Sequence, residues 1–282
     1  MLRLGIALAG DKALTDSIAL AKAVDEYGFD TLTVYDDLMF KPAWPILTAM
    51  ALQTQRVRLG PGIVNPYLMH PAVLAGHAAL LDELSNGRAY LGIGKGAFLE
   101  FLQVDQPRPI ATLREAIEII KRLLRGDRTP YHGKVFHATE SAFFRWTPPR
   151  AGIPIMVGTW GPKMTEMAAA VADEVKASAM WNTEYARRLG EHIRIGAERA
   201  GRNPADVTLV IGPLTSVSED RAAARARARH ALAIYLPYLH PMTEFVGIDP
   251  EIIQRVGAAS SRGDYATAAG FISDDTLGRL TL

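Results

Sequence analysis

Hydrophobic and polar positions alternate along the chain in two different periods. Short apolar runs, such as residues 2–8 and 153–158, have the length and composition of buried strands. Between them lie stretches with apolar residues at helical spacing, such as residues 15–27, where Thr15 is a candidate N-cap and Gly28 marks the end. The repeated alternation predicts a parallel sheet covered by helices.

Seven strand–helix units can be traced in this way. The predicted strands cover residues 2–8, 30–35, 56–64, 88–93, 153–158, 174–179 and 206–217. The predicted helices cover residues 15–27, 43–54, 71–85, 110–125, 184–200 and 219–236, and one more begins near Pro162. Both a closed barrel and a doubly wound sheet have this pattern. A barrel domain typically takes about 250 residues, so we expect residues 1–282 to form one α/β domain of the TIM type.

Two segments depart from the alternation. Residues 127–150 are rich in Thr, Pro and aromatic residues, which predicts an irregular insertion, either a short hairpin or an excursion over the barrel. Residues 250–257 and 264–271 look helical, but no eighth strand precedes them. We therefore expect a (β/α)8 barrel whose last βα unit is missing, through truncation or irregular closure.

Composition narrows the classes of partner. Lys and Arg (31) nearly balance Asp and Glu (30), which gives no reason to expect a nucleic-acid or membrane partner. The absence of cysteine excludes disulfides, thiolate metal sites and a cysteine nucleophile. No signal peptide precedes the first strand, and no apolar run approaches the roughly 20 residues of a membrane span. We expect a soluble cytoplasmic protein.

Catalytic groups in barrels lie at the carboxyl ends of the strands. The second strand ends at Asp36 and Asp37, either of which is a candidate acid or polar substrate ligand. The alternative is that one carboxylate caps the next helix and the other is solvated. Phe40 and Trp44 follow and are candidates for walls of a substrate pocket.

Glycines mark the next two strand ends. The third strand runs into Gly60-Pro61-Gly62-Ile63-Val64-Asn65, and glycines inside a strand indicate a bulge or a close approach of a ligand. The fourth strand ends in Gly92-Ile93-Gly94-Lys95-Gly96-Ala97, which matches a dinucleotide-binding pattern. We reject that interpretation because the helix begins only near residue 110. Instead, we expect these glycines to leave space at the barrel mouth and Lys95 to meet an anion.

The fifth strand ends in a turn that suits phosphate. Gly158, Thr159, Gly161, Pro162 and Lys163 lead into a helix whose first N–H groups and dipole favour an anion. An ordinary capped loop is the alternative. The chain contains no metal-binding His-Glu motif, no serine-hydrolase elbow and no P-loop, so we expect no metal site.

Three blocks resemble the luciferase-like flavin- and F420-dependent oxidoreductases. They are LGPGIVNPYLMHPAVLA (59–75), ELSNGRAYLGIGKG (83–96) and PIMVGTWGPKMTEMAA (154–169), and their order and spacing are more specific than any one of them. Within this superfamily the chain is most similar to the coenzyme F420-dependent branch, especially the methylenetetrahydromethanopterin reductases.

The resemblance implies a barrel that forms a homodimer and binds coenzyme F420. It places a non-proline cis peptide at Gly62-Ile63, behind the deazaflavin ring, with Ile63, Val64 and Asn65 lining that ring. It also assigns the cofactor phosphate to the turn at residues 158–163. Many relatives carry Asp-His after the second strand, whereas this chain has Asp36-Asp37, so the resemblance does not carry a proton-donor role to Asp37.

The implied reaction is hydride transfer between coenzyme F420 and a small organic substrate, in which the cofactor supplies the redox chemistry. One alternative is an FMN-dependent luciferase-like monooxygenase. Because coenzyme F420 continues into an acidic tail where FMN ends in a phosphate, basic residues at the outer mouth discriminate between the two, and Lys41, Lys95 and Arg108 are candidates. A second alternative is a non-catalytic barrel that binds a ligand or cofactor.

Overall fold

The computed structural model describes residues 2–179 and 181–281. The chain divides into two compact units. Unit 1 comprises Met1–Gly158 and Val171–Glu174, and unit 2 comprises Thr159–Ala170 and Val175–Leu282. No helix in residues 2–179 or 181–281 is long and apolar enough to cross a membrane.

The strands of unit 1 are parallel, apart from a small hairpin. The first sheet has the order β1 (Gly5–Leu8), β2 (Thr31–Val34) and β3 (Arg58–Pro61). A second pairing joins β4 (Leu91–Gly94) to β7 (Ile155–Gly158). Isolated parallel bridges at Leu59–Ala89 and Val64–Ile93 connect the two groups of strands.

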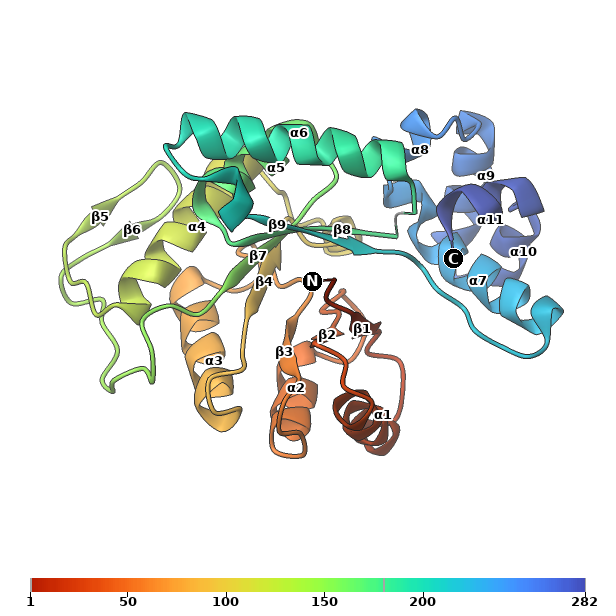
Figure 1. The fold of residues 1–282 in the computed structure, drawn as a ribbon. Coiled ribbons are helices and arrows are strands. Elements are labelled where there is room, and N and C mark those ends of the chain that lie inside the picture. The colour runs from red at the N-terminus through yellow and green to blue at the C-terminus, as the bar shows by residue number, and fades with distance from the viewer. Residues whose placement is uncertain (1, 180, 282) are drawn as a thin grey trace. The chain divides into compact units, whose positions relative to one another are not determined.

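Helices follow the first four strands in turn (Figure 1). They are α1 (Leu14–Glu26), α2 (Ala43–Ala51), α3 (Pro71–Leu84) and α4 (Pro109–Leu124), and a short 3-10 helix η1 (Leu99–Leu102) precedes α4. Their apolar faces are buried, as at Leu47, Leu74 and Ile117. The predicted N-cap at Thr15 is wrong, because α1 begins at Leu14 after Ala13.

The irregular segment forms the short hairpin that was one of the two expectations. Strands β5 (Tyr131–His132) and β6 (His137–Ala138) are antiparallel. The buried carboxylate of Glu115 on α4 accepts hydrogen bonds from the backbone N–H groups of Lys134, Val135 and Phe136 at 2.8–3.0 Å. The hairpin is therefore fastened to α4 by its own backbone.

Unit 2 contains the remaining strands and a helical cluster. Its elements are α5 (Pro162–Val171), β8 (Glu174–Ser178), α6 (Thr183–Arg199), η2 (Pro204–Asp206), β9 (Thr208–Gly212), α7 (Arg221–Tyr235), η3 (Leu236–Tyr238), α8 (Met242–Phe245), α9 (Pro250–Ser260), α10 (Tyr265–Gly270) and α11 (Asp274–Leu280). The helices from α7 onward share an apolar core that includes Leu232, Met242 and Val256. All seven predicted parallel strands are present, and Leu214 forms a further parallel bridge with Thr281.

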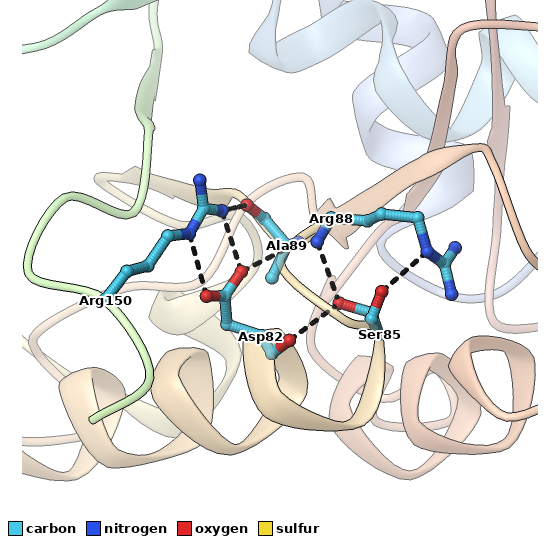
Figure 2. A network of polar contacts seen from close by, with 5 residues as sticks. All are labelled: Asp82, Ser85, Arg88, Ala89 and Arg150. Carbon is cyan, nitrogen blue, oxygen red and sulfur yellow. Dashed lines mark hydrogen bonds and ion pairs between the residues drawn. The ribbon is translucent and has the colours of Figure 1, made fainter. Parts of the chain in front are cut away.

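A polar network holds the amino end of β4 to α3 (Figure 2). Asp82 is fully buried and accepts two hydrogen bonds from the Arg150 guanidinium, at 2.7 and 2.8 Å, and one from the Ala89 N–H. Arg88 donates to the Ser85 carbonyl at 2.7 Å, and the Ser85 hydroxyl lies between Asp82 and Arg88. Every oxygen of the Asp82 carboxylate is thus engaged, which is what burial of a charge requires.

Candidate active site

The chain bulges directly after β3. The peptide bond between Gly62 and Ile63 is cis, as the resemblance implies. The backbone of Val64 then rejoins β4, donating to Gly92 O and accepting from Gly94 N, both at 2.9 Å. Before the bulge, the Gly62 N–H donates to Val34 O of β2 at 2.8 Å, so strand pairing holds it at both sides.

Two glycines make room for the side chain of the bulge. A Cβ on Gly94 would overlap Cδ1 of Ile63, and a Cβ on Gly158 would lie 2.8 Å from Cγ2 of Ile63. The space expected beside Gly94 is thus occupied by the Ile63 side chain. Gly94 and Gly158 fix the position of Ile63, which remains half-exposed at the strand ends.

Asn65 shapes the loop that follows. It is buried, and its Oδ1 accepts from the N–H groups of Tyr67 and Leu68 at 3.2 and 2.9 Å. Its side chain also packs on Gly96, where φ is +87° and an added Cβ would lie 2.9 Å from Asn65 Nδ2. The neighbouring Lys95 is exposed, and its carbonyl accepts from Gln106 Nε2.

Asp36 follows β2 and performs the capping role that was its alternative. Its Oδ1 accepts from the Ala43 N–H at the first residue of α2, at 2.7 Å. Burial raises the pKa of Asp36 and outweighs the lowering effects of this hydrogen bond and of nearby His77. A carboxyl group with a raised pKa keeps its proton to a higher pH than an ordinary aspartate does, which suits it to act as an acid.

The indole N–H of Trp44, on α2, is a buried hydrogen-bond donor. The side chain is 7% exposed and stacks on His77 of α3, with ring centroids 5.0 Å apart. Within residues 2–179 and 181–281, its buried Nε1–H has no hydrogen-bond partner. Since buried donors are normally satisfied, this N–H is available to an acceptor on a bound molecule.

The other predicted residues after β2 have different surroundings. Asp37 and Phe40 are half-buried, and the Phe40 N–H donates to the Asp37 carbonyl at 3.2 Å. The Nζ of Lys41 donates to the carbonyls of Asp11 and Lys12, at 3.2 and 2.9 Å. Lys41 thus joins two loops through its ammonium group, and an anion would have to compete with both carbonyls.

The predicted phosphate turn opens unit 2. The buried Thr159 hydroxyl accepts from Gly161 N–H at 3.1 Å, so one of the N–H groups expected to meet a phosphate is already capped. Pro162 begins α5, as predicted, and Lys163 is exposed beside it. The Trp160 indole fixes the turn by donating to Ser178 O at 2.7 Å.

Sequence reasoning missed several residues that the fold brings to these positions. The sequence did not single out His77, which stacks on Trp44 and acts electrostatically on Asp36. Arg114 and Lys134 also escaped notice, although they line one cavity with Arg108. A carboxylate at Glu115, in an otherwise apolar helix stripe, was the available signal that α4 anchors another segment.

Relatives of known function share most of the chain. The 5,10-methylenetetrahydromethanopterin reductase of Methanolobus tindarius is 31% identical over 91% of this chain and 78% of its own length. An F420-dependent glucose-6-phosphate dehydrogenase of Beutenbergia cavernae is 30% identical over 98% of this chain and 85% of its own. The solved F420-dependent tetrahydromethanopterin reductase of Methanopyrus kandleri superposes with a TM-score of 0.88 at 26% identity, covering 99% of this chain and 85% of that one.

That superposition confirms an α/β fold with parallel strands of the type found in the luciferase-like barrels. The sequence pattern of luciferase-like monooxygenases matches residues 3–282, nearly the whole chain. The protein belongs to the luciferase-like monooxygenase family.

Proposed function

We propose that the protein is an oxidoreductase that transfers a hydride between coenzyme F420 and a small organic substrate, in the manner of a methylenetetrahydromethanopterin reductase. Relatives named as F420-dependent enzymes or as methylenetetrahydromethanopterin reductases support both the cofactor and the reaction class. The observation in the molecule that carries the proposal is the bulge after β3, where the Ile63 side chain is held against Gly94 of β4 and Gly158 of β7.

The residues at the carboxyl ends of the strands fit a planar ring with polar edges. Ile63 offers a half-exposed apolar surface whose position two glycines fix, which suits the face of a ring. The unpartnered Nε1–H of Trp44 is an orphaned buried donor that a polar group of a ligand would satisfy. Val64 and Asn65 complete the proposed ring site.

When bound in its reduced form, the deazaflavin supplies a hydride from C5 of its ring. The protein must then hold the substrate carbon at near-contact distance, because positioning is its main contribution to such a reaction. We assign Trp44 to a polar group of the substrate and Phe40 to the pocket wall. Gly94, Lys95 and the turn formed by Gly158, Thr159, Gly161, Pro162 and Lys163 are assigned to the cofactor, the turn to its phosphate.

Asp36 is the group we assign to proton exchange with the substrate. Its raised pKa keeps a proton on the carboxyl to a higher pH than usual, while its Oδ1 stays on the Ala43 N–H. Asp37 is the second catalytic candidate by position. Replacing Asp36 with Asn keeps the cap acceptor and removes the titrating group, so kcat should fall while the cofactor affinity is unchanged. Unchanged turnover would remove Asp36 from the mechanism.

The family description as monooxygenases favours a second candidate, an FMN-dependent monooxygenase. Titration of the purified protein with coenzyme F420 and with FMN, followed by fluorescence quenching, separates the two. Binding of FMN with no response to coenzyme F420 would overturn the proposal. Tight binding of coenzyme F420 without turnover of any pterin, alcohol or sugar-phosphate substrate would favour a non-catalytic binding barrel.

We also propose that the enzyme is a cytoplasmic homodimer acting on a small molecule. The resemblance to F420-dependent relatives supports the dimer, and the near balance of acidic and basic residues supports a role without membrane or nucleic acid. Light scattering after size-exclusion chromatography tests the dimer, and a single-chain mass would contradict it.

A further inference from the structure

A basic cavity lies between α4 and the β5–β6 hairpin of unit 1. Its volume of about 700 Å³ falls within the range of roughly 300–1,000 Å³ that is usual for small-molecule sites. Three cationic side chains line it, namely Arg108, Arg114 and Lys134. A cavity of this size holds several carboxylate groups, and its lining selects for negative charge.

The three cations are not neutralised by neighbouring side chains. Among residues 2–179 and 181–281, no ion pair within 4.0 Å is formed by Arg108, Arg114 or Lys134. The one carboxylate in the lining, Glu115, is occupied by three backbone N–H groups of the hairpin. These hydrogen bonds outweigh the effect of its burial and lower the pKa of Glu115. Its charge thus anchors the hairpin, and the cavity keeps an excess of positive charge.

The same contacts hold the backbone of Lys134 against α4. Glu115 Oε1 accepts from the backbone N–H of Lys134 at 2.8 Å, and the absence of a side chain at Gly133 lets the carboxylate approach. Arg108 lies at φ +49°, a left-handed conformation that side chains rarely adopt. Arg108 holds this conformation at the N-cap of α4, and residues in such sparsely populated backbone conformations cluster at functional sites.

Hydrogen bonds connect the cavity to the proposed ring site. Asn65 holds the N–H of Tyr67, and the Tyr67 hydroxyl donates to the Pro107 carbonyl at 3.2 Å, immediately before Arg108. On the other side, Gln106 donates to the carbonyl of Lys95, next to Gly94. The loop that carries Arg108 is therefore tied to both strand ends that flank the bulge.

We propose that Arg108, Arg114 and Lys134 bind the acidic tail of coenzyme F420, while the ring lies at Ile63–Asn65. This inference rests on the proposed function and adds a subsite to it. Guanidinium and ammonium groups pair with carboxylates through charge-assisted hydrogen bonds. The cavity thereby discriminates coenzyme F420 from FMN, which ends in a single phosphate.

Fluorescence titrations of the full protein test the proposal with two probes. One is coenzyme F420, and the other is a form that keeps the ring, ribityl chain and phosphate but lacks the acidic tail. In an Arg108→Glu, Arg114→Glu double variant, the Kd for the full coenzyme should rise by more than about tenfold. A rise of this size corresponds to the loss of at least one hydrogen bond between charged groups. The Kd for the tailless form should stay within about twofold, and added salt should weaken only the full coenzyme.

Arg125→Glu, at the other end of α4, is the matched control and should bind both probes as the wild type does. Lys134→Glu is an independent variant in the hairpin and should repeat the selective loss. Equal affinity of the variants and the wild type for the full coenzyme, or an equal loss for both probes, would overturn the tail site. Failure of the wild type to bind either probe would instead overturn the proposed function.

Discussion

The two ends of the strands in unit 1 use acidic residues in opposite ways. At the amino ends, Asp25 accepts from three backbone N–H groups of residues 55–57 at 2.7–2.9 Å, and Asp82 accepts from Arg150 and Ala89. At the carboxyl end of β2, Asp36 has one such backbone bond and a raised pKa. Carboxylates that accept several hydrogen bonds stabilise the fold. A carboxylate with a single hydrogen bond can still bind a ligand or a proton.

The same contrast holds for hydrogen-bond donors. At the amino ends, the Arg88 guanidinium donates to the carbonyls of Ala51, Thr54 and Val57. On α2, following the carboxyl end of β2, the indole N–H of Trp44 has no partner among the residues described. This division matches the general rule that barrel enzymes place function at the carboxyl ends of the strands and stability at the amino ends. Five substitutions test it.

Replacing Asp82 with Ala should have the largest effect. It removes the fully buried partner of Arg150 and the acceptor of the Ala89 N–H, so the free energy of unfolding should fall by about 3 kcal/mol, as for other broken buried pairs. Urea denaturation measures the change. Arg187→Ala is the control, because Arg187 pairs with Glu184 and Glu191 on an exposed face and should leave the denaturation midpoint unchanged. An equal loss of stability in the two variants would contradict the assignment of stability to the amino ends of the strands.

Replacing Gly94 with Ala should act on both stability and binding. The new Cβ overlaps Ile63, so the bulge must shift, at a cost of about 1–3 kcal/mol for overpacking. The affinity for coenzyme F420 should fall by roughly tenfold or more if that shift moves the ring site. Gly152→Ala meets no atom within 4 Å and is the matched control for both measurements. If the Gly94→Ala variant binds coenzyme F420 with the affinity of the wild type, the bulge is not part of the cofactor site.

The pH dependence of stability should have opposite signs at the two ends. Burial opposes ionisation of Asp25, but backbone hydrogen bonds outweigh it and lower its pKa, so its contribution is present above the ordinary pKa and is lost as the pH falls through the folded value. Burial raises the pKa of Asp36, so its contribution is present below the ordinary pKa and is lost as the pH rises through the folded value.

Relative to the wild type, Asp25→Asn should therefore be less stable at neutral pH and should approach it in acid. Asp36→Asn should be as stable as the wild type or more so at neutral pH, and that difference should vanish in acid. Urea midpoints between about pH 3 and pH 7 measure both. Parallel curves for the two variants would show that the carboxylates at the two ends do not differ in this way.

Replacing Trp44 with Phe should have the smallest effect on stability. The change removes an unsatisfied buried donor and keeps most of the ring stacked on His77, so the free energy of unfolding should stay equal or rise by about 1 kcal/mol. Turnover should fall, because the substrate loses a donor. A large loss of stability would mean that the indole N–H has a structural partner, such as a buried water.

The order of the elements followed from the sequence. Seven strands of a parallel sheet and the start of α5 near Pro162 were predicted, because each depends on periodicity and propensity within a short segment. The hairpin within residues 127–150 was one of two alternatives. The blocks around residues 59–75 and 154–169 also led to the family and to the cis bond at Gly62-Ile63. Local signals failed at Thr15, where the chain entered α1 without its cap.

Only the tertiary structure decided which side chains meet. Ile63 fills the space at Gly94 and Gly158, His77 reaches Trp44, and Lys41 is held by two carbonyls. Arg108 and Lys134 share a cavity although a whole helix separates them in the chain. These contacts depend on how the helices and strands pack against one another. The period of a sequence pattern indicates which face of an element is buried, but it does not indicate which residue of another element that face contacts.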